Sequence, residues 1–359
     1  MNTGKNPTYF QRVAEQSPTR FWINNPTMAE ARQAIDAGAY GCTCNPSFCQ
    51  KMLEHPTRYE FAWEMLDAAV LESDTDSQAE VLLQRKLAKP VADLFLSFYD
   101  RNPRMDGFVS LQGDPTREDD AKVITEEAYG NCEVSRNMCA KIPVTGAGLK
   151  AIETLVADDI AINSTEIFGV AQALALCDTY DRASRGSGKS PVIFLSHIAG
   201  IYDDYLRGYV EKHRVDIAPD VLWQAGLAVA RKVHRLLIER GYPAIMIGGG
   251  ARGLHHFTEM VGGRLVVTIN WLGTADKLIE QNPPVVYRLF NPVPERVIDE
   301  LMEKLPDFRR GYLADGLTVE EFEHFGPVEL FRGSFVKSWE RVLALAKERR
   351  IALATTARH

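Results

Sequence analysis

The chain has 359 residues, of which 45% are hydrophobic and 25% charged, and its formal net charge is -7. This length suits either one α/β barrel or two smaller domains. The acidic balance excludes the basic surface of a typical nucleic-acid-binding protein. No apolar run approaches the roughly 18 residues of a membrane span, and no apolar leader follows Met1, so we expect a cytoplasmic protein without membrane contact.

Six cysteines in a chain of this size favour reduced thiols over a disulfide framework. The cluster "CTCNPSFC" places Cys42, Cys44 and Cys49 at a spacing that is not typical of zinc ligands, so we predict small buried thiols. His255 and His256 are neighbours on a predicted helix, and at that spacing we expect their imidazoles to lie on different faces. The sequence therefore predicts no metal site.

Short apolar runs alternate with helical patterns along the chain. We predict strands over residues 20–24, 40–45, 107–112, 137–144, 159–165, 191–198, 244–250 and 264–270. The predicted helices cover residues 27–38, roughly 58–100 with Pro90 as a boundary or kink, 117–130, 146–157, 167–183, 202–213, 219–240, 253–262, 274–281 and much of 294–349. The short acidic stretch at 72–80 is predicted to be a solvated turn between helices.

Eight strands that are nearly all followed by a helix indicate parallel strands with helical crossovers. We expect a (β/α)8 TIM barrel with additional helices after the second strand and at the C-terminus. The expected organisation is one barrel domain over residues 1–359, with an N-terminal extension of about 1–19 and a C-terminal helical segment of about 294–359. A doubly wound open sheet is the alternative, although "GGGARG" (248–253) does not match the dinucleotide-binding fingerprint.

Alternate residues of a strand face the same way, and the strand ends of a barrel surround the active-site mouth. Lys141 lies in the otherwise apolar run "MCAKIPV" and is the only cation of the polar set at these ends. Desolvation disfavours the ammonium form, and a neutral lysine can attack a carbonyl to give a Schiff base. Alternatively, Lys141 reaches out of the strand end to solvent. The full polar set is Asn24, Thr43, Asn45, Ser110, Gln112, Lys141, Asn163, Thr165, Ser196, Thr268 and Asn270.

Five segments in order resemble the transaldolase family, which belongs to the class I, Schiff-base-forming aldolases. They are "GCTCNPSF" (41–48), "AKIPVTGAGLKAIETL" (140–155), "INSTEIFGVAQALA" (162–175), "FLSHIAGIYDDYL" (194–206) and "IMIGGGARGLHHFTEMVGG" (245–263). The resemblance extends from about residue 20 to 345. It implies a (β/α)8 barrel, no metal or cofactor, and transfer of a dihydroxyacetone unit from a ketose phosphate to an aldose phosphate, as in the pentose phosphate pathway.

The resemblance also implies roles for single residues. Lys141 would form the Schiff base, and Thr165 would hold a catalytic water. Arg252 would bind the substrate phosphate, where a glycine-rich strand exit also suits an anion; a solvated surface arginine is the alternative. The remaining substrate-binding residues would be Thr43, Asn45, Ser47, Asn163 and Ser196, of which Asn45 and Asn163 would bind hydroxyl groups and Ser196 the dihydroxyacetone part.

Three residues depart from the family pattern. Asn24 aligns with the acid–base aspartate of the first strand, and Gln112 aligns with the glutamate of the third strand. Ile201 aligns with a second phosphate-binding arginine. An amide does not exchange a proton as a carboxylate does. Glutamine at position 112 also resembles the fructose-6-phosphate aldolase branch, so Gln112 is compatible with catalysis, whereas Asn24 implies another acid or another reaction.

Four residues are candidates for that other acid, namely Glu166, Asp114, Asp203 and His197. Glu166 has the wrong strand parity, and we expect the four to be solvated or to cap helices. Three functions therefore stay open: an ordinary transaldolase, a diverged aldolase for a non-standard or non-phosphorylated carbonyl substrate, and a catalytically weak sugar-binding protein. The expected partner is a sugar or sugar phosphate. A homo-oligomer of the chain is a further expectation.

Overall fold

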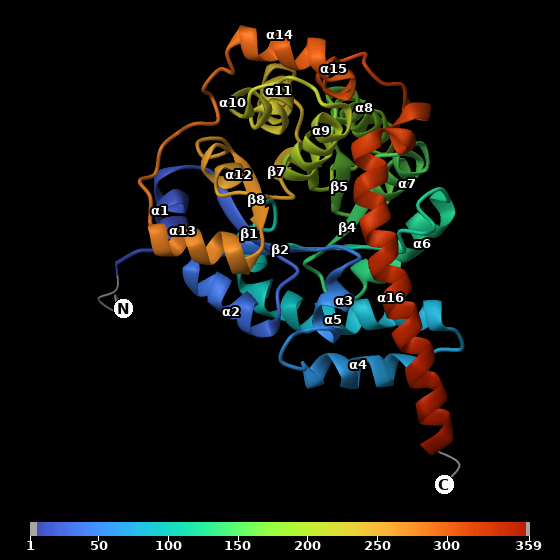
Figure 1. Ribbon diagram of the computed structural model, residues 1–359. Coiled ribbons are helices and arrows are strands. Elements are labelled where there is room, and N and C mark those ends of the chain that lie inside the picture. Colours follow the sequence, from blue (N-terminus) through green and yellow to red (C-terminus); the bar gives the residue numbers. More distant parts are fainter. Residues whose placement is uncertain (1–5, 357–359) are drawn as a thin grey trace.

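The computed structural model describes residues 6–356, and its centre is a closed barrel of eight parallel strands (Figure 1). Each strand pairs with the next, and β8 pairs with β1. The predicted (β/α)8 barrel is therefore confirmed, and the open-sheet alternative is wrong. The strands are β1 Arg20–Asn24, β2 Ala39–Cys44, β3 Val109–Gln112, β4 Met138–Pro143, β5 Ile162–Ile167, β6 Ile193–His197, β7 Ile245–Gly248 and β8 Leu265–Ile269.

Helices surround this barrel on its outer side (Figure 1). The N-terminal half contains α1 Tyr9–Gln16, α2 Met28–Ala37, α3 Phe48–Leu53, α4 Glu60–Leu71, α5 Asp76–Arg101, α6 Ala121–Cys132, α7 Gly146–Ala157 and α8 Val170–Ser187. The C-terminal half contains α9 Ala199–His213, α10 Pro219–Leu222, α11 Ala225–Glu239, α12 His255–Thr258, η1 Trp271–Ala275, α13 Asp276–Gln281, α14 Glu295–Lys304, α15 Pro306–Tyr312, η2 Val319–His324 and α16 Gly326–Thr356. No helix among residues 6–356 is both long and apolar enough to cross a lipid bilayer.

The additional helices after β2 are α3, α4 and α5. The turn between α4 and α5 covers residues 72–75, so the predicted solvated turn over 72–80 is wrong for its second half, where α5 has begun and Glu80 is buried. Thr75 caps α5 by accepting a hydrogen bond from the backbone amide of Gln78. Pro90 lies inside α5, so it does not form a helix boundary. Helix α1 was not predicted; Phe10 from α1 stacks on Phe21 of β1 with ring centroids 4.1 Å apart.

The barrel interior has an apolar floor beneath its polar mouth. Trp22 of β1 and Phe194 of β6 meet edge to face inside the barrel, with ring centroids 5.0 Å apart. Gly41 is needed beside them, because a Cβ there would lie 2.5 Å from the Trp22 indole. Asn24 and Ser196 lie two residues after these aromatic residues, so the period of two places them one layer higher.

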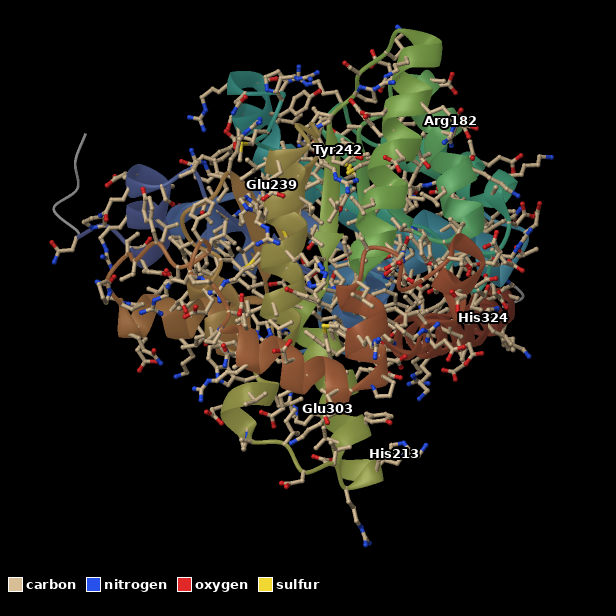
Figure 2. All side chains as sticks on the ribbon, turned by 90° about the horizontal axis from the view of Figure 1, so that it is seen from above. Arg182, His213, Glu239, Tyr242, Glu303 and His324 are labelled. Atoms are coloured by element: carbon tan, nitrogen blue, oxygen red, sulfur yellow. The ribbon has the colours of Figure 1, made fainter. Side chains whose placement is uncertain are left out.

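Helix α16 packs against both the barrel and the additional helices after β2. In Figure 1 it runs past β4 and β5 and continues along α4 and α5. Phe331, Ser334 and Phe335 of this helix line the cavity at the barrel mouth. Charged side chains such as Arg182 on α8 and His213 at the end of α9 lie on the outside instead (Figure 2).

All six cysteines are free, and Cys42, Cys44 and Cys49 are buried. The Sγ atoms of Cys42 and Cys44 lie 3.8 Å apart, and burial raises the pKa of the Cys42 thiol. The prediction of small buried thiols in this segment is confirmed.

Candidate active site

A cavity of about 750 Å³ opens at the carboxyl ends of the strands. Its wall combines strand-end polar groups with the aromatic residues of α16. Eight of the ten predicted site residues line it, namely Asn24, Thr43, Asn45, Ser47, Lys141, Thr165, Ser196 and Arg252. The other two, Gln112 and Asn163, lie behind the wall and contact residues that line it.

Lys141 is buried, with 6% of its surface exposed, although it faces the cavity. Its Nζ donates a hydrogen bond of 2.9 Å to Gln112 Oε1 and lies 5.6 Å from the centroid of the Phe335 ring. Burial lowers the pKa of Lys141 to about 8, against the opposing effect of Glu166 and Glu118. A substantial fraction of this amine is therefore neutral near physiological pH, and the alternative in which it extends to solvent is wrong.

Two carboxyl groups flank the amide of Gln112. Its Nε2 donates to Glu118 Oε1 at 2.8 Å and to Glu166 Oε1 at 3.0 Å. Both glutamates are buried, with 4% and 0% of their surface exposed. Glu118 lies in the loop after β3, where no sequence pattern distinguishes it from the neighbouring solvated acids.

The backbone explains why Glu166 reaches Gln112 against the strand alternation. Glu166 has φ +61°, and the pairing of β5 with β6 shifts register between Ser164 and Ile167. A left-handed residue inside a strand interrupts the alternation of side chains. The expectation that Glu166 has the wrong parity, and is solvated or caps a helix, is therefore wrong.

The three other candidate acids have local partners. Asp114 Oδ1 accepts hydrogen bonds from Thr116, Asp203 pairs with His256 at 2.9 Å, and His197 Nε2 lies 3.1 Å from the carbonyl oxygen of Gly226. Asp114, Asp203 and His197 are all buried, contrary to the expectation of solvation. They are not among the residues that line the cavity.

Amides and hydroxyls form a continuous network at the ends of β1, β2 and β8. Asn24 Oδ1 accepts from Thr43 Oγ1 at 2.9 Å, and Asn24 Nδ2 donates to Asn270 Oδ1 at 2.9 Å. Thr43 and Thr268 share a hydrogen bond of 2.7 Å. Both ends of the Asn24 amide are thus engaged, which fixes its orientation.

Asn25 connects this network to the loop after β2. It adopts φ +44° and donates from Nδ2 to Asn45 Oδ1 at 2.8 Å. Ser47 Oγ donates to the same Asn45 oxygen at 2.6 Å. Lys51 adds a second cavity lysine, but its ammonium is paired with Glu30 at 2.9 Å. Sequence parity did not identify Asn25 or Lys51, because neither lies in a strand.

Asn163 holds two strand-end hydroxyls in place. Its Oδ1 accepts from Ser196 Oγ at 2.7 Å, and its Nδ2 donates to Ser110 Oγ at 3.0 Å. Its predicted contact with substrate hydroxyls stays a prediction. Thr165 lies one pleat further along β5, and its buried Oγ1 has no hydrogen-bond partner among the described residues.

Arg252 lies at the rim of the cavity and forms an ion pair with Asp204. About 40% of its side chain is exposed. Ile201 is buried and lines the same side of the cavity. The two positions that the family resemblance associates with phosphate thus hold one guanidinium paired with a carboxylate that Arg207 shares, and one apolar side chain.

His255 and His256 lie together despite their adjacent positions in the chain. Their ring centroids are 4.0 Å apart, so the expectation that they occupy different faces is wrong. Helix α12 spans only four residues, and Asp203 completes a group whose possible ligand atoms lie within 4.8 Å of one another. The hydrogen bond between His256 and Asp203 already pairs two members of this group.

Comparisons of the sequence with known proteins identify the family. A transaldolase from Thiobacillus denitrificans is 27% identical over 331 residues, which cover 80% of this chain and 87% of that protein. Transaldolases from Neisseria meningitidis serogroup C and Saccharopolyspora erythraea are 30% and 31% identical, over 60% and 42% of their own lengths and 53% and 44% of this chain. The family model for transaldolase/fructose-6-phosphate aldolase matches residues 21–305. The chain therefore belongs to the transaldolase/fructose-6-phosphate aldolase family.

Proposed function

We propose that this protein is a transaldolase-type enzyme whose Lys141 forms a Schiff base with a ketose and transfers a three-carbon dihydroxyacetone unit to an aldehyde. The observation that carries the proposal is the buried amine of Lys141 at the wall of the barrel cavity. A neutral amine condenses with a ketone, and the resulting iminium accepts electrons when the adjacent carbon–carbon bond breaks. The aldehyde half leaves as its hydroxyl group loses a proton, and the remaining enamine attacks the acceptor aldehyde, whose oxygen takes up a proton.

The cavity supports binding of a polyhydroxylated chain. Amide and hydroxyl groups of Asn24, Thr43, Asn45, Ser47 and Ser196 line one part of its wall, and they offer both donors and acceptors for hydroxyl groups. Phe335 of α16 lies beside the amine, with its ring centroid 5.6 Å from Lys141 Nζ, and Phe331 lines the same cavity. Apolar surroundings of this kind disfavour the charged form of the amine.

Borohydride trapping tests this proposal directly. The protein is incubated with dihydroxyacetone, reduced with borohydride, digested and examined by peptide mass spectrometry. We expect a stable adduct on the peptide that contains Lys141. Saturable binding of the sugar without any adduct would instead support a sugar-binding protein. An adduct on Lys51 in place of Lys141 would show that Lys141 is not the reactive lysine.

Lys232 offers a matched control. Burial lowers the pKa of this lysine as well, but its Nζ donates to the Tyr312 carbonyl and it lies outside the barrel cavity. In the wild type the peptide that contains Lys232 should carry no adduct. An adduct on Lys232 as well as on Lys141 would indicate a general reactivity of amines with lowered pKa and not a cavity that binds ketose.

A substrate without phosphate is a second candidate, and the surroundings of Arg252 favour it. Asp204, which also pairs with Arg207, already forms an ion pair with Arg252, and Ile201 provides no charge. A phosphate dianion would have to compete with Asp204 for the guanidinium. Turnover of fructose and fructose 6-phosphate, measured side by side with one acceptor, distinguishes the two; a clear preference for the phosphate ester would exclude this candidate.

A further inference from the structure

A buried pair of carboxyl groups lies next to the reactive lysine, and no catalytic carboxylate occupies the two strand positions that the family resemblance predicts. We refer to Glu118 and Glu166 as the carboxyl pair. The amide of Gln112 joins three groups: it accepts from Lys141 Nζ at 2.9 Å and donates to Glu118 at 2.8 Å and to Glu166 at 3.0 Å. The carboxyl pair and the amine are thus held in one hydrogen-bonded unit.

The fold maintains Glu166 in an unfavourable backbone conformation. A non-glycine residue with positive φ is strained and persists only where the surroundings hold it. Gln172 supplies that support from α8. Its Oε1 accepts from the amides of Phe168 and Gly169 at 2.9 and 3.1 Å, and its Nε2 donates to the Glu166 carbonyl oxygen at 2.9 Å. Strain of this kind is concentrated at functional sites.

Two buried carboxyl groups on one amide cannot both ionise without strong repulsion. Burial raises the pKa of Glu166 to about 7 and raises that of Glu118 further above its ordinary range, where the charge of Glu166 adds to the effect. The charged groups that oppose this are Lys141 and Arg332, the latter from α16. At neutral pH the carboxyl pair therefore retains at least one proton beside the amine.

Each member of the carboxyl pair has one oxygen to spare. Oε2 of Glu118 and Oε2 of Glu166 are buried and have no hydrogen-bond partner among the described residues, and the same is true of Thr165 Oγ1. Glu118, Gln112 and Lys141 also line a second cavity of about 10 Å³. A space of about this size holds one water molecule. Such a water could carry a proton from the carboxyl pair towards the amine. The Gln112 amide could not do so, because an amide does not exchange a proton as a carboxylate does.

We propose that the carboxyl pair supplies the proton for Schiff-base formation at Lys141, and that one water in the small cavity beside Glu118, Gln112 and Lys141 carries it to the substrate. This inference rests on the proposed function. In the step, the hydroxyl oxygen of the carbinolamine receives one proton and leaves as water with the electron pair of its C–O bond, while the nitrogen lone pair forms the C=N bond. The iminium gains one positive charge and the carboxyl pair one negative charge. Hydrolysis of the Schiff base returns the proton.

The test follows the rate at which borohydride-trapped dihydroxyacetone accumulates on Lys141, as a function of pH. In the wild type the rate should rise as Lys141 loses its proton and fall at higher pH as the carboxyl pair loses its last proton. Glu166→Gln keeps an oxygen that can accept from Gln112 but cannot give up a proton. We expect its rate to fall by about 10²-fold or more, with the alkaline decline moved to lower pH because Glu118 remains as the single acid, and with the final amount of adduct unchanged.

Glu118→Gln provides a second variant. Removing one acid of a close pair makes the other ionise more readily. The alkaline decline should therefore move to lower pH, which a loss of folding would not produce. Glu80→Gln is the matched control, because Glu80 is a fully buried acid of α5, outside the cavity, whose pKa burial raises to about 10. Its rate and pH profile should equal those of the wild type.

The outcomes separate the two proposals. If the wild type forms no adduct on Lys141, the proposed function and this inference both fail. If the wild type forms the adduct and Glu166→Gln forms it at the same rate with the same pH profile, the role of the carboxyl pair alone is refuted.

Discussion

Lys141 donates its hydrogen bond to the amide oxygen of Gln112 and not to a carboxylate, at a distance of 2.9 Å. A carboxylate at this distance would stabilise the ammonium and raise the pKa of the lysine. The amide accepts the same hydrogen bond without a net charge. Gln112 therefore orients the amine and lets burial keep it partly neutral, while its two N–H groups hold the carboxyl pair.

Replacing the reactive amine should abolish Schiff-base chemistry and leave the fold intact. Lys141→Met retains a long flexible side chain and removes the cost of burying a charge. We expect no borohydride-dependent adduct, a loss of turnover by several orders of magnitude, and a melting temperature equal to or above that of the wild type. Adduct on another lysine with full turnover would contradict the assignment of Lys141.

Asn24→Asp should raise classical transaldolase turnover by introducing an acid–base group at the end of β1. Asn24 accepts from Thr43 and donates to Asn270, so a carboxylate fits once the Asn270 amide turns its Nδ2 towards it. We expect an increase of about tenfold or more in turnover of fructose 6-phosphate with an aldose phosphate. Asn270→Asp is the comparison variant, and it should not raise turnover. Unchanged or lower turnover of Asn24→Asp would count against the role assigned to this position.

Ile201→Arg should increase the preference for phosphorylated substrates. Ile201 lines the cavity on the same side as Arg252, which forms an ion pair with Asp204. A second guanidinium would pair with a phosphate oxygen, and a charged hydrogen bond contributes about 1.5–3 kcal/mol. We expect the KM for fructose 6-phosphate to fall about tenfold relative to the KM for fructose. An equal change for both sugars would show that the position does not contact phosphate.

Glu166 should make the stability of the protein depend on pH. Its folded-state pKa is raised from 4.5 to about 7, so its favourable contribution is present below pH 4.5 and is lost as the pH rises through 7. Glu166→Gln lacks this loss. The melting temperature of the variant relative to the wild type should therefore be higher at pH 8 than at pH 5, by a few degrees. If the difference in melting temperature between the variant and the wild type is the same at pH 5 and pH 8, folding does not raise the pKa of Glu166.

Gln172→Ala should release the strained turn at Glu166. The substitution leaves the amides of Phe168 and Gly169 without their side-chain acceptor, and a buried unsatisfied donor costs about 1–3 kcal/mol. We expect a lower melting temperature and an adduct-forming rate reduced towards that of Glu166→Gln. Gln84→Ala is the control, because it removes another buried glutamine side chain, on α5 and outside the cavity. It should lower stability without slowing adduct formation. A Gln172→Ala variant with the full rate would show that the turn is not needed.

The sequence by itself predicted the barrel and most of its polar mouth. Apolar runs with a period of two are local features, and the parity of Trp22 and Asn24 or of Phe194 and Ser196 follows from the pleat alone. Lys141 was identified because an ammonium in an apolar strand is costly unless it faces a cavity. Asn24, Thr43, Asn45, Thr165 and Ser196 line that cavity as strand parity predicts, whereas Ser47 and Arg252 were expected only from the family resemblance.

Only the tertiary structure determined which acidic residues lie near Lys141 and which aromatic residue lies beside it. Glu166 turns towards Gln112 through a single left-handed residue at a shift of strand register, and such a shift depends on the neighbouring strand. Glu118 lies in a loop, and Phe335 comes from a helix almost 200 residues after Lys141, so no local pattern links them to the lysine. Alternation within a strand fixes which way a side chain points, whereas the contacts between distant segments fix what it meets.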